Sequence, residues 1–84
     1  MKIVRISAIW CTSCILTKKD FDLIKEKYKD FEYEELDYDT DDIEKYNIGD
    51  TIPVIIVYKD NKELTRIIGE KRFKDIDNVL RELV

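Results

Sequence analysis

The feature that most constrains the fold is an uninterrupted apolar run near the middle of the chain, Val54-Ile55-Ile56-Val57-Tyr58. β-Branched and aromatic side chains favour strands. A strand in which polar and apolar residues do not alternate is usually covered on both faces. The run therefore predicts a central strand with a layer on each side, as in an α/β fold. A chain of 84 residues has a thin core, so this strand must form a large part of it.

Periodicity along the rest of the chain predicts the element order β-α-β-α-β-β-α. The expected strands are 2–7, 32–38, 54–58 and 64–68, and the expected helices are 11–29, a short one from Thr40 or Asp41 through Tyr46, and 72–84. Asp60-Asn61 predicts a hairpin turn. Strands that alternate with helices favour parallel pairing through right-handed crossovers, and the hairpin adds one antiparallel strand. We expect a four-stranded mixed sheet with helices on both faces.

Composition limits the organisation and the partners of the chain. One Pro and two Gly leave no flexible linker, so we expect a single domain over residues 1–84. Acids outnumber bases by 19 to 15, which disfavours binding to a phosphate backbone. No apolar run approaches the ~20 residues of a membrane span, and the charged first six residues do not resemble a signal peptide. We expect no nucleic-acid or membrane partner and a cytoplasmic location; abundant Ile and Lys without His or Gln suggest a microbial or viral gene.

Two cysteines, Cys11 and Cys14, lie three positions apart. The chain has no His, which excludes a Ser-His-Asp triad, a Cys-His pair and most zinc sites. A bridge between these cysteines would close so short a loop that it would add little stability. The pair therefore points to chemistry. A zinc site completed by carboxylates or by a second chain, and a pair of inert core cysteines, remain as alternatives.

The cysteine pair falls between an expected strand and an expected helix. Cys11 lies at the helix N-terminus, where free backbone N–H groups and the helix dipole favour a thiolate. Cys14 lies one turn later, on the helix face that also carries Thr17 and Phe21. We therefore expect Cys11 to attack a substrate disulfide first, and Cys14 to attack Cys11 and release the reduced substrate.

Trp10-Cys11-x-x-Cys14 resembles the active-site motif of the thioredoxin family, with Thr12-Ser13 in place of the usual Gly-Pro. Ile52-Pro53 before the apolar strand, and Ile68-Gly69 after the hairpin, resemble the second half of the same fold. The resemblance covers nearly the whole chain. It implies a minimal thioredoxin fold with a length close to that of glutaredoxins.

The resemblance also implies which residues meet the substrate. It implies a cis peptide bond at Ile52-Pro53 that faces the cysteines, with the Ile52 backbone pairing with an extended substrate segment. The alternatives are a trans Pro53 at the start of a strand, a Trp10 that only covers the core, and a Gly69 that only ends a strand. The residues expected on the substrate-binding surface are Trp10, Thr12, Ser13, Ile52, Pro53 and Gly69.

One pair of positions departs from the family pattern. Typical thioredoxins carry a buried Asp six residues before the first cysteine, where it helps to move a proton to or from the second thiol, and a neighbouring lysine pairs with it. Here the first position is Arg5, and Glu35 matches the second. This predicts an inverted charge pair, in which Glu35 takes the proton role and Arg5 stabilises the Cys14 thiolate. Alternatively, both side chains point into solvent at a strand edge.

The resemblance implies a monomeric reductase of protein disulfides with no bound cofactor, which carries electrons as a redox-active Cys11–Cys14 disulfide. Its electrons would come from a flavin-containing thioredoxin reductase or a similar donor. A glutaredoxin-like, glutathione-linked reductase is one alternative, supported by Thr51-Ile52-Pro53 and by the length. A redox-sensing or metal-handling binding module without enzymatic activity is another.

Overall fold

The structure, a computed structural model, describes residues 1–84 and contains four strands, two α-helices and one 3₁₀ turn. In chain order these are β1 (Lys2–Ser7), α1 (Thr12–Lys27), β2 (Glu32–Asp37), η1 (Glu44–Tyr46), β3 (Val54–Lys59), β4 (Lys62–Ile68) and α2 (Phe73–Leu83). The expected strands and long helices are therefore confirmed, with ends that differ by at most two residues. No helix is long and apolar enough to cross a membrane.

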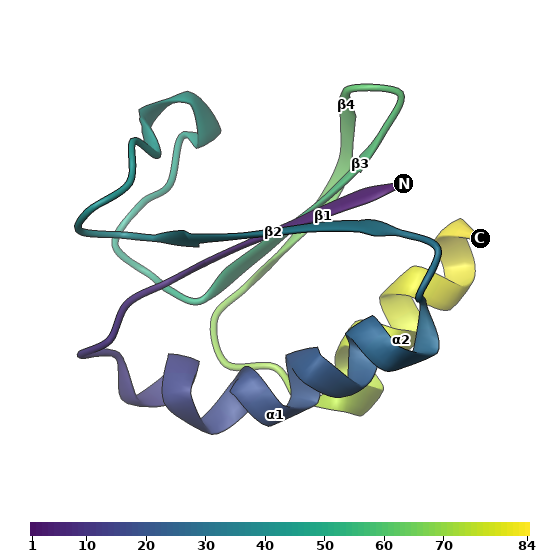
Figure 1. Ribbon diagram of the computed structural model, residues 1–84, viewed down its shortest axis with the longest axis horizontal. Coiled ribbons are helices and arrows are strands. Elements are labelled where there is room, and N and C mark those ends of the chain that lie inside the picture. The colour runs from purple at the N-terminus through teal and green to yellow at the C-terminus, as the bar shows by residue number, and fades with distance from the viewer.

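The four strands form one mixed sheet in the order β2-β1-β3-β4. β1 pairs with β2 in parallel, whereas β3 is antiparallel to both β1 and β4. The expectation that β3 would also pair in parallel was wrong. A parallel connection needs a crossover of about a dozen residues or more, which is usually an α-helix. Residues 38–53, between β2 and β3, form no α-helix that would carry the chain across the sheet; their only helical part is the three-residue η1, and the chain enters β3 at the edge where β2 ended (Figure 1).

The side chains of the sheet fill two cores. On one face, Ile3, Ile55 and Val57 pack with Phe21 and Ile24 of α1 and with the apolar face of α2. On the other, Val4, Ile6, Val54 and Ile56 pack with Tyr46 of η1 and with the cysteines. Both α-helices lie on the same face, and η1 with its flanking loop lies on the other (Figure 1). The run at 54–57 is buried on both faces, as its pattern predicted.

The second expected helix is reduced to η1 because aspartates near its start bind nearby backbone groups instead. Asp37 Oδ1 accepts hydrogen bonds from the backbone N–H groups of Asp39 and Thr40, at 2.8 and 3.2 Å. Asp41 Oδ2 accepts a third, from the N–H of Asp37, at 2.7 Å. Such local bonds compete with the helical ladder. The second face of the sheet therefore carries a loop and a single turn where an α-helix was expected.

Two buried aspartates connect the helices. Asp20 of α1 accepts hydrogen bonds from the backbone N–H of Phe73 at 3.0 Å and from Arg72 Nε at 2.9 Å, so it caps the start of α2. Asp77 of α2 accepts hydrogen bonds from Lys27 Nζ and from the Tyr28 hydroxyl, both at 2.7 Å. These contacts fix α2 against α1 and so fix the chain that follows β4.

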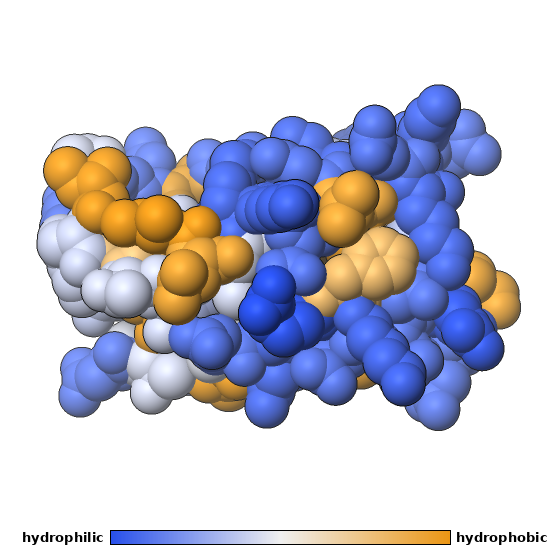
Figure 2. All heavy atoms as spheres, turned by 90° about the horizontal axis from the view of Figure 1, so that it is seen from below, coloured by the Kyte–Doolittle hydropathy of each residue, from blue (hydrophilic) through white to orange (hydrophobic).

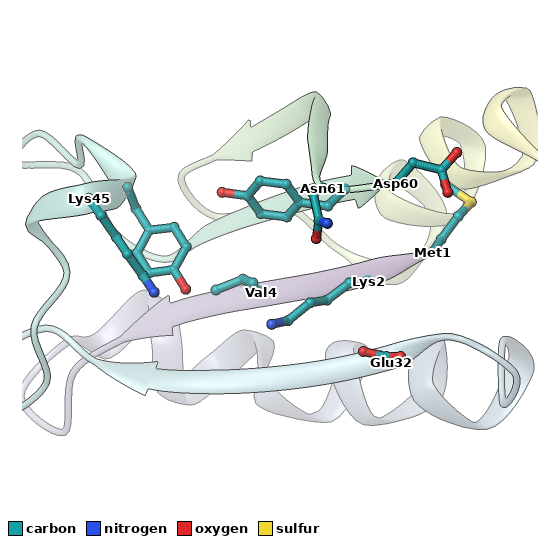
Figure 3. Close-up of a pocket in the computed structure, with 9 residues that line it drawn as sticks. Met1, Lys2, Val4, Glu32, Lys45, Asp60 and Asn61 are labelled. Carbon is teal, nitrogen blue, oxygen red and sulfur yellow. The ribbon is translucent and has the colours of Figure 1, made fainter.

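A groove of about 470 Å³ lies over β1, on the sheet face that carries η1 (Figure 3). The residues that line it include Lys2, Glu32, Lys45 and Tyr58. Neither cysteine lines it. The groove is therefore separate from the chemistry that the sequence predicted.

Candidate active site

The topology brings four chain segments to one edge of the sheet. β1 ends there and leads into α1, and β4 ends there after the hairpin. β3 begins there, because it is antiparallel to β1. The cysteine pair, Ile52-Pro53 and Gly69 belong to these segments. The sheet therefore gathers residues that are up to 58 positions apart around the N-terminus of α1.

Cys11 is the N-cap residue of α1. Its Sγ accepts a hydrogen bond from the backbone N–H of Cys14 at 3.2 Å. Its thiol donates to the carbonyl of Ile52 at 3.7 Å, and its backbone N–H donates to the carbonyl of Ala8 at 3.2 Å. The residue is 8% exposed, and both cysteines are free thiols. The sulfur that was predicted to react first therefore lies at a helix N-terminus, where anions are stabilised.

Cys14 lies one turn into α1 and is only 3% exposed. Burial raises the pKa of its thiol to about 11, and the hydrogen bond with Cys11 adds to this effect. The positive charge of Arg5 opposes the shift without cancelling it. Cys14 is therefore held as a neutral thiol at neutral pH. This agrees with the order of attack that the sequence predicted.

The Ile52–Pro53 peptide bond is cis, and Ile52 lies directly against Cys11. The carbonyl of Pro53 accepts a hydrogen bond from the N–H of Gly69 at 2.9 Å, which ties the start of β3 to the end of β4. Gly69 has φ +89°, in the region that favours glycine, and a Cβ there would lie 3.7 Å from Thr51 Cγ2. Gly69 is thus placed beside the proline loop by its own backbone conformation.

Trp10 is 59% exposed beside Cys11, so it does not simply cover the core. Its indole N–H donates to Asp39 Oδ2, and its ring meets that of Tyr38 edge to face with centroids 6.3 Å apart. The sequence analysis assigned no role at the site to Asp39. Asp39 lies 29 residues after Trp10, and only the parallel pairing of β2 with β1 brings the two residues together. The sequence therefore contains no pattern that predicts this contact.

Exposed apolar side chains surround the cysteine pair, and the sequence analysis missed four of them. The apolar rim, as we call this set, consists of Ile9, Trp10, Ile15, Leu16 and Ile68, which are 52–84% exposed. Figure 2 shows apolar side chains gathered at one end of the helical face. Ile15 and Leu16 lie off the core-facing stripe of α1. That position was the signal that could have identified them.

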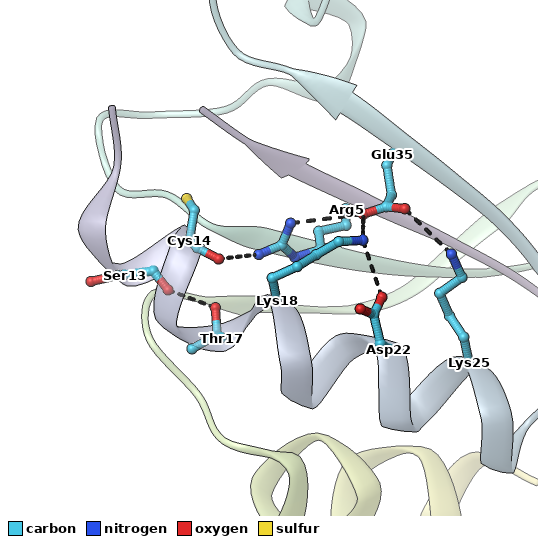
Figure 4. Close-up of polar contacts among 8 residues, drawn as sticks. All are labelled: Arg5, Ser13, Cys14, Thr17, Lys18, Asp22, Lys25 and Glu35. Carbon is cyan, nitrogen blue, oxygen red and sulfur yellow. Dashed lines mark hydrogen bonds and ion pairs between the residues drawn. The ribbon is translucent and has the colours of Figure 1, made fainter. Parts of the chain in front are cut away.

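Arg5 and Glu35 lie side by side at paired positions of β1 and β2. Arg5 Nη1 is 3.9 Å from Glu35 Oε1, and Arg5 Nη2 donates to the carbonyl of Cys14 at 2.8 Å (Figure 4). The Arg5 side chain is 3% exposed and that of Glu35 is 33% exposed. Arg5 therefore does not point into solvent, and it reaches the backbone of the second cysteine.

Glu35 also binds two lysines of α1. Its carboxylate accepts hydrogen bonds from Lys18 Nζ at 2.7 Å and from Lys25 Nζ at 3.4 Å. Partial burial would raise the pKa of Glu35, but these two lysines outweigh it and hold the pKa below its usual value. No hydrogen bond joins Glu35 to either cysteine.

The two residues between the cysteines occupy the first turn of α1. Thr12 is exposed, and Ser13 is half-buried with its carbonyl accepting a hydrogen bond from Thr17 Oγ1 at 2.7 Å. Nowhere in the structure do three or more His, Cys, Asp or Glu side chains cluster as metal ligands would.

Comparison with known proteins gives the family. A family model described as Thioredoxin matches residues 1–82. Thioredoxin H2 of Arabidopsis thaliana is 31% identical over 72 residues, which are 83% of this chain and 53% of that protein. Thioredoxin-2 of Saccharomyces cerevisiae is 32% identical over 69 residues, 80% of this chain and 65% of that protein. The chain thus spans between about half and two thirds of the length of these relatives.

Solved structures give the same fold. Thioredoxin-2 of the malaria parasite, described as a component of its protein secretion machinery, superposes with a TM-score of 0.88 over 96% of this chain and 81% of its own, at 19% identity. Deadhead, the germline-specific thioredoxin of Drosophila melanogaster, gives 0.89 over 99% of this chain and 80% of its own, at 20% identity. The chain belongs to the thioredoxin family.

Proposed function

We propose that this protein is a thiol–disulfide oxidoreductase that reduces protein disulfides, with Cys11 as nucleophile and Cys14 as resolving thiol. The observation that carries the proposal is the asymmetry of the pair. The Cys11 sulfur caps the N-terminus of α1 and keeps 8% exposure, whereas Cys14 lies one turn into the helix, is 3% exposed and has a raised pKa. The glutaredoxin-like alternative is not favoured, because the matching family model and the two relatives are thioredoxins.

In the first step the Cys11 thiolate attacks one sulfur of a substrate disulfide. A sulfur–sulfur bond forms between Cys11 and the substrate, the substrate disulfide breaks, and the second substrate sulfur leaves as a thiolate. The helix N-terminus and the N–H of Cys14 stabilise the attacking anion. Ile52, next to Cys11, offers backbone groups that would pair with an extended substrate segment.

In the second step Cys14 loses its proton and attacks Cys11. The new Cys11–Cys14 bond releases the first substrate sulfur as a thiolate, so two electrons pass from the dithiol to the substrate. Because the pKa of Cys14 is about 11, only a small fraction of it is ionised at neutral pH. Deprotonation of Cys14 therefore limits the second step at neutral pH.

The apolar rim supports a protein as substrate. Contiguous exposed apolar side chains on a small domain mark interaction surfaces. Trp10 gives a large flat contact beside the nucleophile, and its bond to Asp39 fixes the orientation of the ring. We propose that Trp10, Thr12, Ser13, Ile52, Pro53 and Gly69 bind the substrate together with this rim.

The wider setting is part of the same proposal. We propose that residues 1–84 act as one domain, as a monomer in the cytoplasm, with no bound cofactor and no nucleic-acid or membrane partner. The oxidised pair would be reduced by a flavin-containing thioredoxin reductase or a similar donor. Addition of purified reductases of this class, with NADPH consumption as the readout, tests this part separately.

Reduction of insulin disulfides by excess dithiothreitol tests the activity, because the free insulin B chain precipitates and scatters light. We expect catalytic amounts of the protein to accelerate precipitation, Cys11→Ser to abolish the acceleration, and Cys14→Ser to accumulate a mixed disulfide visible by intact mass. The chain has no other cysteine, so every adduct is assigned to this pair. No acceleration by the unaltered protein would contradict the proposal.

A further inference from the structure

Arg5 is a charged side chain in an unusual position. It lies in the middle of β1, between Val4 and Ile6, which are both buried, and is itself 3% exposed. Burial of an unpaired charge is costly, so its partners show what holds it there. They are the Cys14 carbonyl at 2.8 Å, the Glu35 carboxylate at 3.9 Å and the face of the Phe21 ring, whose centroid is 5.4 Å from Arg5 Cζ.

We propose that Arg5 is a positioning residue for the second step of the exchange, which holds the first turn of α1 and favours the Cys14 thiolate by its fixed positive charge. Glu35 then serves to hold Arg5 and does not carry the proton. This inference rests on the proposed function, since it concerns how Cys14 resolves the mixed disulfide.

The contacts of Arg5 give it both parts of this role. Its hydrogen bond to the Cys14 carbonyl connects β1 to the first turn of α1. The bond holds the backbone of Cys14, the residue whose thiol attacks Cys11. A guanidinium stays protonated at any pH that a protein experiences, so Arg5 can neither give nor take the proton. Its charge lowers the pKa of Cys14 against the larger opposite effect of burial.

The contacts of Glu35 exclude it from the proton role. A group that shuttles protons works best when its pKa is near the working pH. The lysines of α1 hold the pKa of Glu35 below its usual value, so it stays ionised. Arg5 lies between its carboxylate and Cys14, as Figure 4 shows. The proton of Cys14 therefore does not pass to Glu35 when Cys14 attacks.

The resolving step can be followed alone with Ellman's reagent, an aromatic disulfide. Attack by Cys11 releases one thionitrobenzoate and leaves a second one bound as a mixed disulfide. Attack by Cys14 then releases the second, which absorbs at 412 nm. We expect the rate of this second release to rise about tenfold for each pH unit, without a plateau between pH 6 and 9, because the thiolate fraction of Cys14 sets it.

Three substitutions separate the roles. Arg5→Gln is expected to slow the second release about tenfold at pH 7, the effect of removing one nearby opposite charge. Arg5→Lys keeps the charge and is expected to restore most of the rate. Glu35→Gln is expected to change the rate less than threefold and to leave its pH dependence intact. Lys18→Gln is the matched control, because it removes a positive charge from the same cluster at a 45% exposed position.

A second readout does not depend on turnover. In a Cys11→Ala background the only thiol is Cys14, and its rate of alkylation by iodoacetamide against pH gives its titration midpoint. We expect Arg5→Gln to raise this midpoint and Lys18→Gln to leave it unchanged. If the insulin assay fails while this shift is present, the proposed function is wrong, and only the effect of the Arg5 charge on the Cys14 thiol stands.

The inference has a clear contrary result. If Arg5→Gln leaves both the second release and the midpoint unchanged, or if Glu35→Gln alone slows the release tenfold and produces a plateau with pH, Arg5 does not have this role. Arg5→Met is the second variant, in case Arg5→Gln does not fold. It removes the charge without stranding Glu35, which keeps Lys18 and Lys25.

Discussion

Phe21 supports both the helical core and the buried arginine of the site. It is fully buried on α1, its ring meets that of Tyr33 edge to face with centroids 5.9 Å apart, and Arg5 lies over its face. Burial of about 150–250 Å² of such a side chain is worth about 4–6 kcal/mol at roughly 25 cal/mol per Å². Measured Phe→Ala changes in cores cost about 3–5 kcal/mol, in agreement with this value.

We therefore expect Phe21→Ala to lower the free energy of unfolding by about 3–5 kcal/mol. A domain of 84 residues has about 4–13 kcal/mol in total, so this variant would be at the margin of folding at 25 °C. Phe21→Leu keeps an apolar side chain and is expected to cost less, although Arg5 loses the ring. Leu23→Ala is the matched control on the same helix, where the side chain is 41% exposed and its loss should cost less than about 1 kcal/mol.

Urea unfolding followed by far-UV circular dichroism measures these differences, because the slope with urea should stay constant while the midpoint falls. If Phe21→Ala cost less than Leu23→Ala at an unchanged slope, α1 would not be held to the sheet by this ring. The account of how the helix and Arg5 are positioned would then be refuted.

Three further predictions concern stability. Asp20→Ala removes the hydrogen bond that caps α2 at Phe73, and it should lower the free energy of unfolding in urea by about 0.5–2 kcal/mol. An unchanged free energy would mean that this cap does not stabilise the fold. The lowered pKa of Glu35 stabilises the folded state above the pKa of Glu35 in the unfolded chain, and this stabilisation is lost as pH falls. Glu35→Gln should therefore make the fall of the unfolding free energy at acid pH less steep. An unchanged slope at acid pH would contradict this. Burial and the bond to Asp77 raise the pKa of Tyr28 to about 12, so its contribution should be present below pH 10 and lost between pH 10 and 12. Absorbance at 295 nm should show this late titration and its disappearance in Tyr28→Phe.

Those features of the fold that depend on local pattern could be predicted from the sequence. The run at 54–57 has no polar break, and it is the strand buried on both faces. Asp60 and Asn61 both have positive φ, at 53° and 65°, which is the turn chemistry that their residue types favour. The position of Cys11 and Cys14 at a helix N-terminus could be predicted, because the pattern of apolar residues changes from that of a strand to that of a helix at this point of the chain.

Features that depend on tertiary contacts could not be predicted in this way. Burial patterns carry no information on strand direction, so the antiparallel start of β3 was missed. The helix expected before Tyr46 does not form, because the side chains of Asp37 and Asp41 accept hydrogen bonds from nearby backbone N–H groups. Whether such bonds replace the helical ones depends on the surrounding loop. The bond from Trp10 to Asp39 exists only because β2 lies beside β1.

The central claim is that Cys11 and Cys14 form a reversible redox pair, and a redox titration tests it most directly. The protein is equilibrated across thiol–disulfide buffers, free thiols are alkylated, and the adducts are counted by intact mass. We predict one two-electron transition near about −270 mV, in which both thiols disappear together, as expected of a reductant with the thioredoxin potential. A chain that keeps two free thiols across the whole range would contradict the claim, and a transition near about −120 mV would contradict its role as a reductant.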